Sequence, residues 1–135
     1  MDKIDKKLRA YQQAELNAMV AYRGLAERYE EGKRRDLLQS VAAQEGRHAA
    51  VFRGLTCVHL KCKNGLKRAF VVLHFLLKDD LTLRVLAFGE KKAGKGYERF
   101  VQKYDINELT SIAQDEYEHA ERLLASARDK NEKKK

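Results

Sequence analysis

Four glutamates and two histidines recur at matched spacings in the two halves of the chain. The set consists of two Glu-x-x-His motifs and two further glutamates, one upstream of each motif. Its members are Glu15, Glu45, His48, Glu90, Glu116 and His119. A spacing of three residues puts a carboxylate and an imidazole one turn apart on the same helix face. Both side chains can then reach one ligand, and carboxylate with imidazole is a combination that binds metal ions.

The six residues lie on stripes that are otherwise made of Leu, Val, Ile, Phe and Tyr at helical spacing. Such stripes face the core, where an ionised carboxylate costs several kcal/mol. No Lys or Arg lies on the stripes between the glutamates, so the compensating charge must come from elsewhere. Four carboxylates and two divalent cations balance, which predicts a two-metal centre. Mixed carboxylate and imidazole ligation favours iron or manganese over zinc or calcium.

Apolar periodicity predicts four long helices to position these residues, over about 3–31, 33–55, 80–104 and from 106 onward. Gly32 is a stop signal for the first helix and Asp105 a candidate N-cap of the fourth. The connection 56–79 contains a short, very apolar helix at 66–77. The fold expected is therefore all-α, with two helical hairpins joined by a crossover. We expect one domain over 1–130 and a disordered basic tail at 131–135.

The two hairpins form an internal repeat. When Glu15 is set over Glu90, Tyr22 falls on Tyr97 seven residues later. In the second helices, residues 38–49 lie over 109–120, and Leu, Ser, Ala, Glu, His and Ala match in register. One Glu-x-x-His arises by chance in many charged helices. Two copies on core stripes, each with a matching partner helix, favour a metal site and a bundle with pseudo-two-fold symmetry.

Composition excludes several classes. The 135 residues suit one domain, and two cysteines are too few for a disulfide framework or a four-cysteine metal site. The longest uncharged apolar run, 69–77, is far shorter than the ~20 residues of a membrane span. We expect a cytoplasmic protein with no membrane association. The net charge of +8 lies partly at the chain ends and has no aromatic–basic motif beside it, so we do not expect nucleic acid binding. A metal-free basic adaptor is the competing hypothesis.

Four other polar residues are interpreted more simply. His59 and His74 lie in the connection between the hairpins and outside the repeat, and we expect neither to bind metal. Cys57 and Cys62 are interpreted as free thiols in preference to a redox pair.

The motifs Glu15-x6-Tyr22, Glu45-x2-His48, Glu90-x6-Tyr97 and Glu116-x2-His119 resemble those of the ferritin-like di-iron carboxylate superfamily, and most closely those of rubrerythrin-type proteins. Residues 14–28 and the apolar helix 66–77 are also similar to the ferritin-like domain associated with vacuolar-type iron transporters. The resemblance covers about residues 8–125 and implies a ferritin-like four-helix bundle. It implies two iron ions, with manganese as the alternative metal.

The resemblance also implies a role for each matching residue. Glu45 and Glu116 would bridge the irons, Glu15 with His48 would complete one iron, and Glu90 with His119 the other. Tyr22 and Tyr97 would each hydrogen-bond a ligand carboxylate across the bundle, and their identical offsets in both hairpins favour this role over ordinary core packing. The sequence departs from rubrerythrins at Ala93, where they carry a further glutamate, and it lacks their four-cysteine rubredoxin module.

The function implied is that of a di-iron redox protein that reacts with O2 or H2O2, as a peroxidase or a ferroxidase, with an external electron donor. Non-catalytic iron storage or delivery is the alternative. The helix at 69–77 is apolar on all sides, and a bundle can bury only one of its faces. We therefore expect a homodimer, with exchange of hairpins as one way to form it.

Overall fold

The computed structural model describes residues 2–129, which form helices and the turns and loop that connect them, with no strand among them. The elements are α1 (Lys3–Ala26), α2 (Lys33–Thr56), α3 (Gly65–Tyr104), the 3₁₀ turn η1 (Asn107–Leu109) and α4 (Thr110–Arg128). The predicted all-α class with four long helices is confirmed. The predicted tail at 131–135 lies outside the described residues. The chain divides between Phe75 and Leu76 into two compact units.

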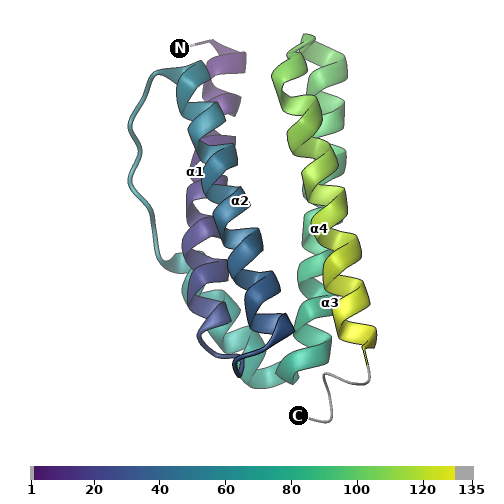
Figure 1. Ribbon diagram of the computed structural model, residues 1–135. Helices are drawn as coiled ribbons and strands as arrows, with labels where there is room; N and C mark the ends of the chain where they lie inside the picture. Colours follow the sequence, from purple (N-terminus) through teal and green to yellow (C-terminus); the bar gives the residue numbers. More distant parts are fainter. Residues whose placement is uncertain (1, 130–135) are drawn as a thin grey trace. The chain divides into compact units, whose positions relative to one another are not determined.

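The first unit is built on the hairpin of α1 and α2 (Figure 1). Asp2 caps α1, because its Oδ1 accepts a hydrogen bond of 2.7 Å from the backbone N–H of Asp5. α1 ends at Ala26 and not at 31, because the chain turns immediately afterward through bonds from Arg28 and Tyr29 to carbonyls three residues back. Gly32 then takes φ 152°, a backbone angle that suits only glycine. Core side chains of this unit include Leu25, Leu38, Val41 and Phe52.

The segment after α2 is tied back along α1 (Figure 1). The Gln12 amide donates to the Val58 carbonyl at 2.8 Å and accepts from the Thr56 hydroxyl at 2.6 Å. Further along, the Lys63 backbone N–H donates to Asn17 Oδ1 at 3.0 Å. These bonds explain how residues without regular structure hold a fixed path: polar side chains of a helix replace the missing backbone partners.

The helix that follows this loop continues to cover α1. The ring of Phe70 meets that of Tyr22 edge-on at 5.3 Å, and His74 stacks on Tyr29 at 4.7 Å. The stem of Lys67 occupies the space that a side chain at Gly24 would need. The first unit is therefore a helical hairpin with a third segment on the outer side of α1.

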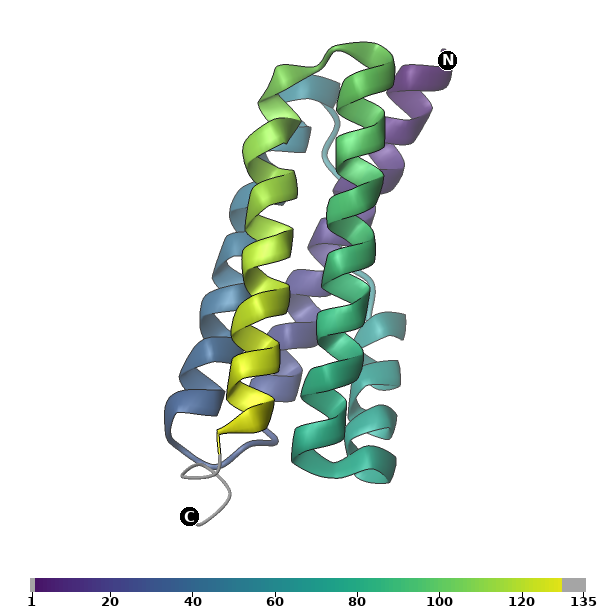
Figure 2. The ribbon, with the colours of Figure 1, turned by 90° about the vertical axis from the view of Figure 1, so that its right-hand side faces the viewer.

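The second unit contains the hairpin of α3 and α4 (Figure 2). α3 is broken at Lys78, whose φ of 62° and ψ of −166° are not helical. Leu83, Phe100, Ile112 and Leu123 are core residues here. The prediction that Asp105 caps α4 was wrong. Its φ of 57° and its N–H bond to the Val101 carbonyl close α3 instead, and η1 intervenes before α4 begins.

No helix among residues 2–129 is both long enough and apolar enough to cross a membrane.

Candidate metal centre

The first unit buries two glutamates and a histidine from two helices. α1 contributes Glu15, and α2 contributes Glu45 and His48. The Nδ1 atom of His48 lies 3.5 Å from Glu15 Oε2 and 3.9 Å from Glu45 Oε1. One ligand atom of each side chain lies within 4.8 Å of the others, and all three side chains are buried. The spacing of three residues in α2 gives this geometry, because it leaves both side chains on the face that meets α1.

The second unit repeats this arrangement. His119 Nδ1 lies 3.2 Å from Glu90 Oε1 and 3.7 Å from Glu116 Oε1. The three residues are at most 6 % exposed, and one ligand atom of each lies within 4.8 Å of the others. As in the first unit, the glutamate on the first helix of the hairpin is the one closest to the imidazole.

Each unit therefore offers two carboxylates and one imidazole at the spacing needed to hold a metal ion. Six titratable side chains at most 6 % exposed are costly to keep unless they are paired or bind cations. The donors are oxygen and imidazole nitrogen, with no thiolate among them, a set that iron and manganese accept readily.

The two tyrosines predicted near the ligands are also buried. Tyr22 is 3 % exposed and Tyr97 is 4 % exposed. Each lies about two helical turns beyond the glutamate of its own helix, on the same face. The position suits the predicted role, and the edge-on contact of Tyr22 with Phe70 shows that packing also holds that ring.

The remaining candidates lie outside both groups. His59 is exposed, and His74 is half-buried against Tyr29. Cys57 and Cys62 are exposed free cysteines, as predicted. Cys57 takes a left-handed conformation where α2 ends, and its N–H bonds the Arg53 carbonyl.

A difference between the repeats was missed by the sequence reasoning. In the first unit Met19 lies over Gly46, and a Cβ placed on that glycine would be 2.9 Å from the methionine sulfur. In the second unit the large and the small residue are exchanged between the two helices. Gly94 on α3 takes the position of Met19, and Tyr117 on α4 takes that of Gly46. A Cβ on Gly94 would be 3.1 Å from Tyr117 Cζ. Comparing the aligned repeats position by position for exchanged sizes could have revealed this pair.

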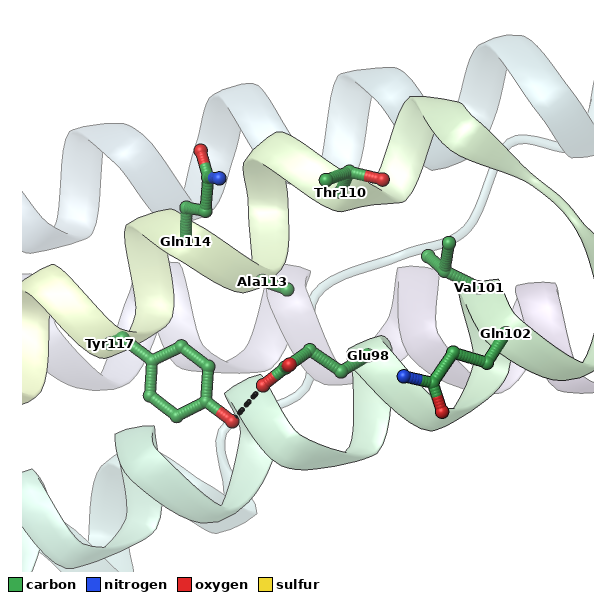
Figure 3. Close-up of a pocket in the computed structure, with 7 residues that line it drawn as sticks. All are labelled: Glu98, Val101, Gln102, Thr110, Ala113, Gln114 and Tyr117. Atoms are coloured by element: carbon green, nitrogen blue, oxygen red, sulfur yellow. Dashed lines mark hydrogen bonds between the residues drawn. The ribbon is translucent and has the colours of Figure 1, made fainter.

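Tyr117 also forms one wall of a pocket of about 290 Å³ between α3 and α4 (Figure 3). Its hydroxyl donates a hydrogen bond to Glu98. This bond stabilises the protonated phenol, and together with the nearby negative charge it raises the pKa of Tyr117 above its usual value of 10.0. Tyr117, which is the residue next to Glu116, is thereby hydrogen-bonded to Glu98 on α3.

Comparison with protein-family models, curated proteins and solved structures finds no match to this chain. The functional assignment therefore rests on the six buried side chains and their spacing.

Proposed function

We propose that the chain is a di-iron redox protein in which the Glu–Glu–His groups of the two hairpins join in one ferritin-like four-helix bundle. The observation that carries this proposal is the duplication of a buried Glu–Glu–His group, with the same spacing and the same His–Glu contact in both units. In this arrangement the segment between the hairpins is the crossover of the bundle. Glu45 and Glu116 would bridge the metals, and manganese is the alternative to iron.

The residues have separate tasks in this proposal. The four carboxylates neutralise two divalent cations, and the histidines add neutral donors. The imidazole Nδ1 atoms face Glu15 and Glu90, so each histidine turns this nitrogen toward the carboxylate with which it would share a metal ion. Burial keeps bulk water away from the ligand atoms. When bound, iron would supply the one-electron chemistry by which O2 or H2O2 is reduced.

Turnover needs electrons from outside this centre. With two cysteines, the 135 residues cannot form a four-cysteine electron-carrier module. Ala93 stands where rubrerythrins carry a further glutamate, which leaves the two ligand groups equivalent. We therefore propose peroxidase or ferroxidase activity with an external electron donor.

The test is an anaerobic Fe²⁺ titration of metal-free protein, followed by exposure to H2O2. Two irons per chain and an oxo-bridge band in the near ultraviolet are expected. Glu45→Ala and Glu116→Ala should each lose iron binding. Glu118→Ala is the matched control, because Glu118 lies on the same helix but is exposed and pairs with Arg122. Iron binding by both ligand variants as strong as that of the parent protein would refute the assignment.

Repeated redox cycles separate catalysis from storage. A catalyst regains its oxidised spectrum with each addition of peroxide after reduction, and releases no iron. Retention of many irons per chain, or their transfer to a chelator without peroxide consumption, would support the storage or delivery function instead.

We also propose that a second copy of the chain covers the apolar helix after Gly65. Every residue from 65 to 75 is exposed or half-buried, although Val72 and Phe75 are large and apolar and are 56 % and 66 % exposed. Burying these side chains favours association by about 25 cal/mol for each Å² of apolar surface removed from water. Light scattering at micromolar concentration should give a dimer, formed by contact or by exchange of hairpins, and a monomer would contradict this.

A further inference from the structure

The outer side of α3 carries a continuous basic face. Its six members are Arg84, Lys91, Lys92, Lys95, Arg99 and Lys103, and all are exposed. At about 100° per residue they fall within roughly 120° of the helix circumference, over a length of about 28 Å. Glu98 is the one acidic residue among the exposed positions from 81 to 103, and the hydroxyl of Tyr117 already bonds its carboxylate. The basic face is therefore a stripe of nearly one sign.

This face lies directly behind a ligand group. Glu90 and Tyr97 are buried on the opposite side of the same helix. One helix diameter, about 10 Å, separates the two sides. A partner bound to the basic face would therefore be separated from Glu90 by the width of this one helix.

The internal repeat shows that the middle of this surface is specific to the second unit, since only its end positions, Arg84 and Lys103, have cationic counterparts in the first unit, Arg9 and Arg28. The α1 residues at the positions of Lys91, Lys92, Lys95 and Arg99 are Leu16, Asn17, Val20 and Gly24. They are half-buried or buried, because the segment after α2 covers them through the Lys63–Asn17 bond and the Lys67 stem on Gly24. The chain thus covers this side of α1 itself, whereas on α3 the same side is exposed and four of its positions are cationic.

We infer that the basic face docks a small acidic protein that carries one electron. The inference rests on the proposed function, which requires an external donor. An acidic partner complements the six cations, and such complementarity steers association and sets its rate. Each encounter oxidises the donor by one electron. Two encounters supply the two electrons that, with two protons, convert one H2O2 into two waters. Nucleic acid would also be attracted by the charge, but it has no electron to give to a site behind this helix.

The test uses an acidic [2Fe–2S] ferredoxin as the probe. Its affinity is measured by calorimetry at low ionic strength with metal-free and with iron-loaded protein, and its reoxidation rate is measured with iron-loaded protein. The variant is Lys95→Glu with Arg99→Glu. The control is Lys6→Glu with Lys7→Glu, which changes the net charge equally at exposed positions on α1. We expect about tenfold weaker binding and slower reoxidation for the α3 variant, and less than a twofold change for the control.

Two further measurements locate the interaction. Carbodiimide cross-linking joins lysine amines to partner carboxylates without a spacer, and mass spectrometry should find the links on Lys91, Lys92 or Lys95. An uncharged donor, tetramethylphenylenediamine, should reduce the α3 variant as fast as the parent protein. That result would show that the centre itself is intact.

The outcomes separate the inference from the function on which it rests. If iron does not bind, the proposed function fails, and ferredoxin affinity can still be measured on metal-free protein. If the uncharged donor supports turnover but both charge variants bind ferredoxin equally, the docking inference alone is overturned. Tighter binding of a 30-base-pair DNA duplex than of ferredoxin, with loss in the α3 variant, would overturn it in favour of nucleic acid.

Discussion

Replacing Gly94 by alanine tests the packing of the second unit one turn beyond Glu90. A helix-interior glycine normally gains about 1 kcal/mol of stability on change to alanine. At Gly94 the new methyl group would lie 3.1 Å from Tyr117 Cζ and 3.2 Å from the Ala113 carbonyl oxygen. That oxygen belongs to the backbone of α4 and can move away only if the helix moves. Overpacking of this kind costs about 1–3 kcal/mol, so Gly94→Ala should be neutral to destabilising.

Gly96 supplies the matched control in the same helix. A Cβ there meets nothing within 4 Å, so Gly96→Ala should realise the gain in helix propensity in full. Both changes carry the gain in helix propensity, so the difference between the free energies of unfolding of the two variants isolates the contact with α4. We expect this difference to be about 2 kcal/mol. For 135 residues the entropy of unfolding is about 0.28 kcal/mol per degree, so the two variants should differ by about 7 °C in Tm.

Thermal unfolding of the metal-free protein, followed by circular dichroism, measures this difference without interference from bound iron. In a Tyr117→Ala background, Gly94→Ala should cost about 1 kcal/mol less than in the parent protein, because the aromatic contact is removed while the contact with the carbonyl oxygen remains. If Gly94→Ala melts at or above the temperature of Gly96→Ala, the close approach of α3 and α4 at this level is wrong.

Three other predictions concern the metal centre, Tyr117 and Gln12. Anaerobic Fe²⁺ at one hundred times its Kd should stabilise the parent protein by about 2.7 kcal/mol for each iron bound, or about 10 °C in Tm per iron. The Tm of the ligand variants should not change with iron, and a parent protein whose Tm does not change would contradict the proposed centre. The Tyr117 phenol should ionise above pH 10, since its hydrogen bond to Glu98 raises its pKa. Glu98→Gln should lower the pH midpoint of the tyrosinate absorbance at 295 nm, and Tyr117→Phe identifies which part of that titration belongs to Tyr117. Any stabilisation from the Tyr117 proton is present below pH 10 and disappears as the pH rises through the folded-state pKa. Gln12→Ala should cost about 1–3 kcal/mol in urea unfolding, because it removes the partners of the Thr56 hydroxyl and the Val58 carbonyl, and an unchanged unfolding midpoint would contradict it.

Periodicity predicted the helices and the burial of the six ligand candidates because both depend on neighbours within one helix. The three-residue spacing in α2 and α4 was sufficient to put His48 beside Glu45 and His119 beside Glu116. Helix ends were less predictable. Aspartate is a residue type that often caps the N-terminus of a helix, but the N–H of Asp105 bonds the Val101 carbonyl and closes the preceding helix.

Contacts between segments far apart in the chain were harder to predict from the sequence. The loop after α2 is polar and shows no period, and its path depends on pairing with Gln12 and Asn17 more than forty residues earlier. The bond from Tyr117 to Glu98 is similar, since neither residue is on a core stripe. Such pairs form only after the helices have packed.

The two hairpins agree where the metal would be held and differ on the outer side of their first helices. Their ligand groups match in residue type, spacing and His–Glu contact. The differences are the exchange of sizes between Met19–Gly46 and Gly94–Tyr117, and the replacement of a covered side of α1 by a basic side of α3. A duplicated hairpin serves a two-metal centre best when both halves offer the same ligands, since each cation then meets the same charge. No such requirement applies to the outer sides of α1 and α3. The first unit can therefore cover its outer side with its own chain, while the second leaves its outer side open to a partner. The asymmetry is what the two proposals would require: matching ligand groups in both units for metal binding, and an exposed basic side in the second unit for an electron donor.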